Sequence, residues 1–217
     1  RKVEENIQGK NVSVELPQLL LDDVDCFISV PVLKVHVMTS VTLSMKNLWG
    51  CYPDTMRGLY HKNLSQKLTL ITKALNPQLI LMDAQYALDG HGPMYGEAKH
   101  LDMILASNNP VVIDALGTAV MGIPLKSAEH ILVAEKEGLG ITGLEKIKMN
   151  DDWKKFQMQF SSNKTIIDSL STLLFKSETM AKLVMDSPVT PLIYGIAKHF
   201  RNSDEKEVVK ELGRYHK

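Results

Sequence analysis

The sequence predicts an α/β domain with a mixed or largely parallel sheet flanked by helices. Short apolar runs typical of buried strands alternate with segments that carry helix-capping residues. Apolar residues make up 44% of the 217-residue chain and charged residues 23%, so a sizeable core is expected. From about residue 150 only helical patterns follow. We therefore predict an α/β core domain over residues 1–150 and a helical C-terminal extension over residues 151–217.

Apolar spacing and proline positions predict the elements of the first sixty residues. Val12, Val14 and Leu16 alternate with polar neighbours, which is typical of a half-buried strand, and Pro17 ends that strand. Residues 41–49 fit either a strand or the first turns of a helix, because their periodicity does not decide. The other elements predicted here are a short helix at 18–21, a strand at 27–33 and a loop at 51–62.

Capping residues predict the helices that follow. Asn63 is expected to cap one helix, and the pair Asn109-Pro110 opens another. Ser127 is expected to cap a third helix, which Gly138 ends. The predicted helices are 63–74, 110–121 and 127–138, and the predicted strands are 79–82 and 103–106, with a glycine-containing loop at 83–96.

Charge, hydropathy and cysteine usage exclude several classes of protein. The chain carries 25 basic and 25 acidic side chains, which argues against a nucleic-acid binder. No apolar run reaches the roughly 18 residues of a membrane span, so no membrane partner is expected. Cys26 and Cys51 form no disulfide framework, which favours the cytoplasm. Because the chain opens with Arg1 and runs at once into a strand pattern, we expect that an N-terminal part of the core domain precedes it.

Residues 28–50 carry the strongest functional signal. Lys34, His36 and Lys46 lie in or just after a strand-like apolar run, and a buried ammonium must be paired or change its pKa. We therefore expect a pocket for a small anion. Its expected binding side chains are Lys34, Thr39, Thr42, Lys46 and Asn47. Alternatively, the lysines extend to solvent from strand ends and His36 is hydrogen-bonded in the core.

The carboxyl ends of the strands are the expected place for this pocket, because ligands of open α/β sheets bind there. Asp83 directly follows a strand candidate, and the loop at 83–96 would form a wall of the pocket. Within it, Asp89, Gly90 and Gly92 would let the backbone approach a ligand closely. A plain turn is the alternative interpretation of these glycines.

Proton transfer and metal binding are further hypotheses. His36 and His61 are the candidate catalytic residues, since an unperturbed imidazole titrates near neutral pH. Nitrogen and oxygen ligands for a divalent metal are offered by His36, His61, Asp83 and Asp89, of which Asp83 is our candidate ligand. Alternatively, Asp83 orients the following loop and His61 faces solvent.

Several motifs in fixed order resemble the core of the "domain of unknown function 362" family. The first two are Ile-Ser-Val-Pro-Val-Leu-Lys-Val-His at 28–36 and Val-Thr-Leu-Ser-Met-Lys-Asn-Leu-Trp-Gly-Cys at 41–51. The others are His61, Leu-Met-Asp at 81–83, Asp-Gly-His-Gly-Pro-Met-Tyr-Gly at 89–96, Ser-Asn-Asn-Pro-Val-Val-Ile-Asp-Ala at 107–115 and Met-Gly at 121–122. The resemblance covers residues 24–140 and leaves out the predicted helical extension.

The resemblance implies a prokaryotic protein associated with redox and anaerobic metabolism, whose relatives often carry a ferredoxin-type iron–sulfur module. Two cysteines cannot supply the four thiolates of such a cluster, so a cluster would come from a ferredoxin-like partner or a missing segment. The expected function is a reductase or lyase acting on a small anionic molecule with an iron–sulfur partner. The alternative is a non-catalytic anion-binding, cofactor-binding or electron-transfer accessory protein.

Overall fold

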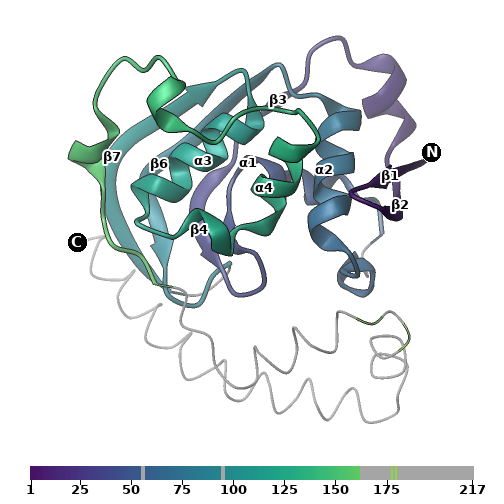
Figure 1. Ribbon diagram of the computed structural model, residues 1–217, viewed down its shortest axis with the longest axis horizontal. Helices are drawn as coiled ribbons and strands as arrows, with labels where there is room; N and C mark the ends of the chain where they lie inside the picture. The colour runs from purple at the N-terminus through teal and green to yellow at the C-terminus, as the bar shows by residue number, and fades with distance from the viewer. Residues whose placement is uncertain (55–56, 94–95, 162–176, 178, 180–217) are drawn as a thin grey trace, which may run out of the picture.

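The computed structural model describes residues 1–54, 57–93, 96–161, 177 and 179 (Figure 1). The strands are β1 (Lys2–Ile7), β2 (Lys10–Glu15), β3 (Ile28–Ser29), β4 (Val32–His36), β5 (Ser40–Thr42), β6 (Leu79–Asp89) and β7 (Glu97–Ser107). The α-helices are α1 (Ser44–Asn47), α2 (Leu64–Leu75), α3 (Pro110–Val120) and α4 (Glu129–Lys136). Short helical turns of other types cover Leu19–Asp23, Leu48–Cys51, Arg57–Tyr60, Leu125–Ser127, Leu144–Lys146 and Trp153–Phe156.

The main sheet is mixed, as the sequence predicts. β6 pairs antiparallel with β7 along residues 80–89 and in parallel with both β3 and β4. Because β7 occupies one side of β6 along this length, β3 and β4 follow each other along the other side. β5 adds an antiparallel edge beside β4. The break between β3 and β4 falls at Val30-Pro31, where proline lacks the backbone donor that a continuous ladder needs.

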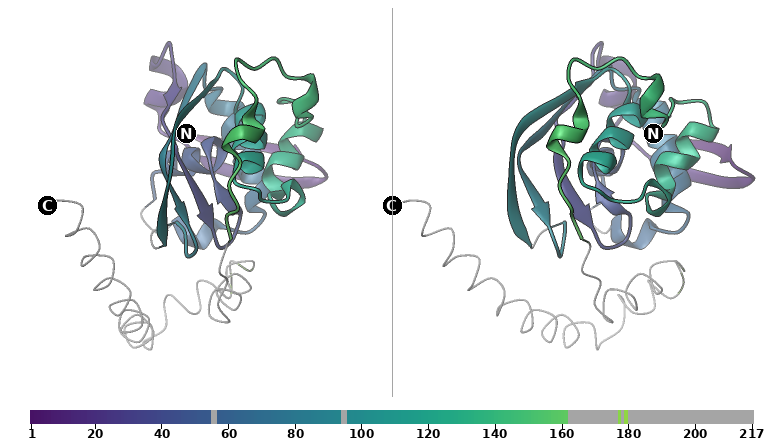
Figure 2. Two further views of the ribbon diagram at one scale, coloured as in Figure 1. Left: turned by 90° about the vertical axis from the view of Figure 1, so that its left-hand side faces the viewer. Right: turned by 60° about the vertical axis from the view of Figure 1, so that its left-hand side comes forward.

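Helices cover one face of this sheet and leave the other open within the described residues. Figure 2 shows α3 and α4 on one side of the strands. The main core fills that side and includes Leu33, Val35, Met82 and Ile113. On the open side, Val32, Asp83 and Ile104 are register partners across β4, β6 and β7, and all three are exposed.

A second apolar cluster joins the N-terminal hairpin to the domain. β1 and β2 form a separate two-stranded sheet that packs against α2. Val14, Leu16, Leu68 and Ile71 lie in this cluster together with Trp49. Since α2 also packs against α4, the helices connect the two clusters.

The end of the sheet differs from the prediction. Residues 83–96 were expected to form one long loop, but β6 continues to Asp89 and β7 begins at Glu97. The prediction was wrong because aspartate and glycine signals suggested a turn, whereas pairing with β7 keeps the backbone extended to residue 89. Residues 41–49 combine both expected forms, a strand to Thr42 and a helix from Ser44.

The three predicted helix caps have different outcomes. Asn63 does occupy the N-cap position of α2, but it adopts a left-handed conformation, with a φ of 54°, and its side chain makes no capping bond. The predicted cap at Ser127 is wrong. The Ser127 hydroxyl donates to the Pro124 carbonyl at 2.7 Å, and α4 begins only at Glu129. The third cap is confirmed, because the Asn109 side chain accepts from the backbone N–H groups of Val111 and Val112, each at 3.0 Å.

Residues 153–161 pack on the α/β core. Trp153 begins a short helical turn, and Phe160 is 2% exposed within the main core. The N–H of Phe160 donates to the carbonyl of Met121 at 2.9 Å, so this segment runs beside the end of α3. The predicted helices at 165–176, 178–186, 191–201 and 204–215 lie outside the described residues, apart from the isolated residue 179.

Gly92 lies where the β6–β7 loop touches the end of β4. A Cβ atom on this residue would lie 1.9 Å from the carbonyl oxygen of Val35. The carbonyl of Gly92 accepts from the N–H of Val37 at 3.3 Å. The absence of a side chain at position 92 therefore lets the loop pack directly against this strand.

We expect Gly92→Ala to destabilise the fold by about 1–3 kcal/mol or more, because the added methyl group would overlap backbone atoms of β4. Urea denaturation of the two proteins measures the difference. Gly50→Ala is the matched control, since a Cβ atom there meets nothing within 4 Å. Equal losses of stability in the two variants would contradict the close packing at position 92.

Candidate functional site

Lys46 is the central side chain of the predicted anion site. It lies on α1, which follows β5 directly, and is 9% exposed. Within the described residues its ammonium group makes no hydrogen bond or ion pair. Burial lowers the pKa of Lys46 to about 8, with smaller contributions from Arg57 and Lys34. Such a buried, unpaired cation is costly without an anionic partner.

Asp114 of α3 holds Lys46 in this place. The buried carboxylate accepts hydrogen bonds from the backbone N–H groups of Ser44 at 2.7 Å and Met45 at 3.0 Å. These are N-terminal donors of α1 that would otherwise lack partners. Burial raises the pKa of Asp114 to about 7, and the bonds from Met45 and Ser44 oppose that rise. The carboxylate thus ties α1 to α3 and orients the helix that carries Lys46.

The end of β4 brings Lys34 and His36 to the same region. Lys34 pairs with Thr42 of β5, and His36 pairs with Ser40. The hydroxyl oxygen of Thr42 is buried and has no hydrogen-bond partner within the described residues. The structure therefore brings Lys34, His36, Thr42 and Lys46 into one region.

His36 is a neutral imidazole with a defined tautomer. Its Nδ1 accepts a hydrogen bond from the N–H of Met38 at 3.0 Å, which leaves the proton on Nε2. Burial lowers its pKa to about 2, and Lys46 is the next largest cause. In the empty site at neutral pH, His36 is therefore a hydrogen-bond donor through Nε2–H rather than a cation.

Aromatic rings connect Lys46 to His61. Trp49 follows Lys46 by three residues on the same helical segment, so the two side chains share a face. The Trp49 ring stacks on His61 with 5.6 Å between centroids and on Tyr52 with 5.2 Å. The indole N–H of Trp49 is buried without a partner in the described part of the chain. The indole N–H is thus a donor available on the segment that follows Lys46.

The groups that shift these pKa values have one sign of charge. Lys34 and Arg57 lower the pKa of Lys46, and Lys46 lowers that of His36. Among the described residues, no carboxylate is among the causes of either shift. An anion placed among them would remove this mutual repulsion.

Three other predicted site residues are exposed or hydrogen-bonded to the nearby backbone. The Thr39 hydroxyl donates to the Val41 carbonyl at 3.0 Å, and Asn47 is exposed. Asp83 is exposed and accepts from the N–H of Gln85 at 2.9 Å. Within the described ranges, no group of three or more histidine, cysteine, aspartate or glutamate side chains is arranged to hold a metal ion.

The carboxylate of Asp89, the last residue of β6, has partners of its own. It forms an ion pair with Lys99 at 2.5 Å. It also accepts from the N–H groups of Gly90 at 2.8 Å and Ser161 at 2.7 Å. Asp89 and Gly90 thus join the sheet to the segment that follows the last helical turn. Gly92 approaches β4 one residue away from His36.

His130 on α4 is a buried residue that the sequence did not indicate. It is 1% exposed, and neither ring nitrogen has a hydrogen-bond partner among the described residues. Burial lowers its pKa to about 3, with a further contribution from Lys46. It also contributes to the lowered pKa of His36, so the three side chains share one region. No motif or spacing in the sequence connects residue 130 with residues 36 and 46.

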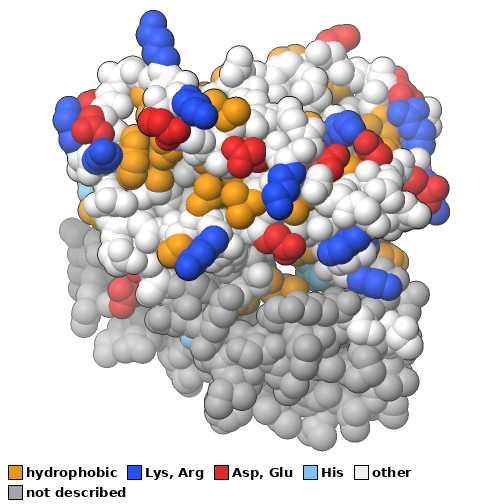
Figure 3. All heavy atoms as spheres, in the orientation of Figure 1, with side chains coloured by type: hydrophobic (Ala, Val, Ile, Leu, Met, Phe, Trp, Pro, Cys, Tyr) orange, Lys and Arg blue, Asp and Glu red, His pale blue; other side chains and the backbone are white. Residues whose placement is uncertain are grey.

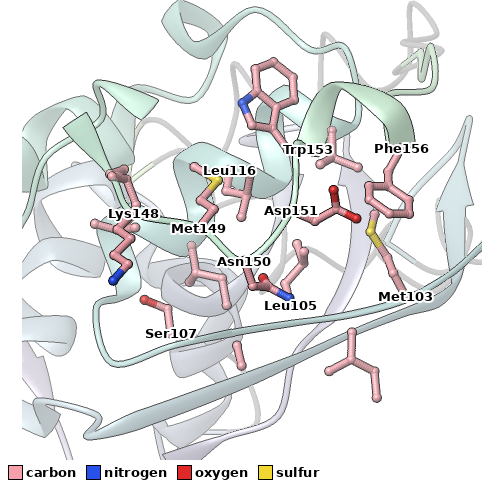
Figure 4. A pocket seen from close by; sticks show the side chains of 16 residues that line it. Met103, Leu105, Ser107, Leu116, Lys148, Met149, Asn150, Asp151, Trp153 and Phe156 are labelled. Atoms are coloured by element: carbon pink, nitrogen blue, oxygen red, sulfur yellow. The ribbon is translucent and has the colours of Figure 1, made fainter. Parts of the chain in front are cut away.

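A separate apolar groove of about 330 Å³ lies between β7, α3 and residues 147–156 (Figure 4). Met103, Leu105 and Phe156 are among the apolar side chains that line it. Ser107 and Lys148 lie toward one end of the view. None of the predicted binding or catalytic residues lines this groove.

The chain is similar to known proteins over the part that carries these residues. A family model described as "Domain of unknown function (DUF362)" matches residues 2–119. The chain belongs to this family. The matched range includes Lys34, His36, Lys46 and Asp114, whereas His130 lies beyond it. The resemblance read from the motifs is therefore confirmed for this DUF362 domain.

A curated relative of the DUF362 chain is a thylakoid-associated protein of Synechocystis sp., sll1697. The two are 28% identical over 130 residues, which is 57% of this chain and 40% of the relative. The chain thus spans about two fifths of that relative's length. No solved structure matches the chain. In the described part of the chain, no helix is long and apolar enough to cross a bilayer.

We expect Asp114→Ala to destabilise the domain, because it leaves two buried N–H groups without acceptors, at roughly 1–3 kcal/mol each. Denaturant unfolding measures the loss. Thr118→Val is the control on the same helix, since it removes one hydroxyl bond to the backbone of residue 114 and keeps the carboxylate. An Asp114→Ala loss no larger than that of the control would contradict the clamp.

The same carboxyl group should give stability a defined pH dependence. Its folded pKa of about 7 lies above the unfolded value of 3.8. The stability that this group contributes is therefore fully present below about pH 4 and is lost as the pH rises through about 7. Asp114→Asn should flatten this part of the stability profile. An unchanged slope between pH 4 and 7 would contradict the raised pKa.

Proposed function

We propose that this DUF362 chain binds a small anion at the end of β4, with Lys46 as its main charged partner. The observation that carries the proposal is that Lys46 is buried without a hydrogen bond or ion pair in the described part of the chain. Lys34 and Arg57 add positive charge nearby, as their effect on the pKa of Lys46 indicates. Buried charges in proteins are normally paired, so an anionic ligand is the simplest missing partner.

The neighbouring groups support this proposal because they can donate hydrogen bonds. His36 offers Nε2–H, and Trp49 and Thr42 offer a buried N–H and a buried hydroxyl. A lysine that extends to solvent is the alternative. The residue is 9% exposed, and burial is the largest cause of its lowered pKa. Asn47 follows Lys46 directly and is exposed, so it would contact the outer part of a larger ligand.

Catalysis is a further part of the proposal. We favour a reductase or lyase that acts on the bound anion, with electrons from an iron–sulfur partner where the reaction needs them. His61 would be the acid or base, because His36 stays neutral in the empty site. The alternative is an accessory protein that holds an anionic cofactor. Free thiols at Cys26 and Cys51 support a cytoplasmic location, although the Synechocystis relative is named for its thylakoid association.

Two histidine variants separate the catalytic and accessory functions. His61→Gln and His36→Gln each keep a hydrogen-bonding side chain but cannot transfer a proton near neutral pH. We expect both to retain at least part of the anion affinity. Turnover of a candidate substrate that disappears in His61→Gln but survives in the parent protein would support chemistry at this site. Equal turnover in His61→Gln and in the parent protein would contradict the role of His61.

We expect Lys46→Met to abolish anion binding while stabilising the empty protein by on the order of 1–3 kcal/mol, because it removes a cation whose pKa burial depresses. Thermal unfolding with and without sulfate or inorganic phosphate measures both effects. The matched control is Lys67→Met, a buried lysine whose ammonium donates to the Tyr60 carbonyl at 2.8 Å. That variant should lose stability and keep anion binding.

An equal anion-induced rise of the melting temperature in the parent protein and in Lys46→Met would contradict the proposal. A destabilised Lys46→Met protein would contradict the unpaired state of the ammonium.

Anion affinity should also fall at alkaline pH. The pKa of Lys46 in the empty site is about 8, so the ammonium loses its proton above that pH. For sulfate, whose charge is constant in this range, we expect the affinity to fall by up to about tenfold per pH unit above pH 8. Calorimetric titration between pH 7 and 9.5 measures the slope. A flat profile would show that Lys46 is not the group that binds the anion.

A further inference from the structure

The imidazole of His130 is buried, and its hydrogen-bonding groups are unsatisfied within the described residues. The ring is 1% exposed, and both of its nitrogens lack partners among the described residues. Leaving a buried donor or acceptor unsatisfied costs about 1–3 kcal/mol for each group. Two such groups on one ring are therefore unlike an ordinary packed histidine, which hydrogen-bonds to the backbone or to a side chain.

The fold brings this ring to the anion site from the helix side. The Ser40 hydroxyl donates to the Ser127 carbonyl at 2.9 Å, three residues before His130, and Ser40 is the register partner of His36. The influence of Lys46 on the pKa of His130 agrees with this placement. His130 thus lies beside the strand end that carries the predicted ligand.

The chemistry of a neutral imidazole differs from that of the other groups in the site. Lys34, Lys46 and the indole of Trp49 can only donate hydrogen bonds. His36 donates as well, because its Nδ1 is already occupied by the N–H of Met38. A neutral His130 carries one N–H donor and one nitrogen lone pair, so it can also accept a hydrogen bond from the ligand.

This difference selects among anions. A fully deprotonated oxyanion has only acceptor oxygens and would leave the His130 lone pair buried and unpaired. An oxyanion that keeps an O–H group satisfies both kinds of partner. Resting on the proposed anion binding, we infer that His130 accepts a hydrogen bond from the ligand and that the site selects oxyanions carrying an O–H group, such as hydrogen phosphate.

Inorganic phosphate and sulfate form a matched pair of probes for this inference. At pH 7.5 both are mainly tetrahedral dianions, but only hydrogen phosphate carries a proton. Isothermal titration calorimetry on the full chain should show phosphate binding about tenfold or more tightly than sulfate, because one hydrogen bond is gained and one unpaired acceptor is removed. His130→Leu should reduce this preference to about onefold, and His130→Gln, which keeps an acceptor, should retain part of it.

The outcomes separate this inference from the proposed function. If the parent protein binds both anions equally, anion binding stands and the role of His130 is overturned. The role is also overturned if His130→Leu folds and keeps the preference for phosphate. If neither anion binds, the proposed function itself fails.

A second measurement does not depend on the leucine variant folding. In the parent protein, the ¹⁵N resonances of the His130 ring should shift on addition of phosphate and shift less with sulfate. Identical ring shifts with the two anions at saturation would overturn the role of His130 as the acceptor.

Discussion

The hydrogen bonds of Asp114 to the N–H groups of Ser44 and Met45 are the interaction on which the site depends. They join α3, which covers the sheet, to α1, which begins directly after β5. A carboxylate at the first turn satisfies donors that a buried four-residue helix cannot satisfy itself. The clamp acts together with the Ser44 hydroxyl, which donates to the Pro110 carbonyl at 3.3 Å, and with Met45, which is buried in the main core.

Lys46 and Lys99 differ in burial and in the partners of their ammonium groups. Lys99, on β7 at the same end of the sheet, is paired with Asp89 and lies over the ring of Phe160. That pair serves structure, since it ties the strands to the segment at 157–161. Lys46 is more deeply buried yet has no such partner in the described residues, and its charged neighbours repel it. Proteins tolerate this cost where a ligand repays it.

The two faces of the main sheet differ in what covers them. Within the described residues, helices cover one face of the sheet (Figure 1). Ile104 on the other face is 73% exposed. On the helix-covered face, basic and acidic side chains are interspersed, in keeping with the balanced charge (Figure 3). The chain spans about two fifths of the length of its Synechocystis relative, so what is proposed here concerns this domain.

The sequence by itself determined the α/β class and the DUF362 family, and it placed Lys34, His36, Thr42 and Lys46 within one short stretch that forms β4, β5 and α1. Periodicity and proline positions are local signals, and they suffice for such features. Only the tertiary structure decided the length of β6 and the partners of Asp89, since both depend on β7 pairing along β6. It also brought His130 to the site across more than eighty residues that follow Lys46. Helix packing sets that approach, and no local pattern encodes it.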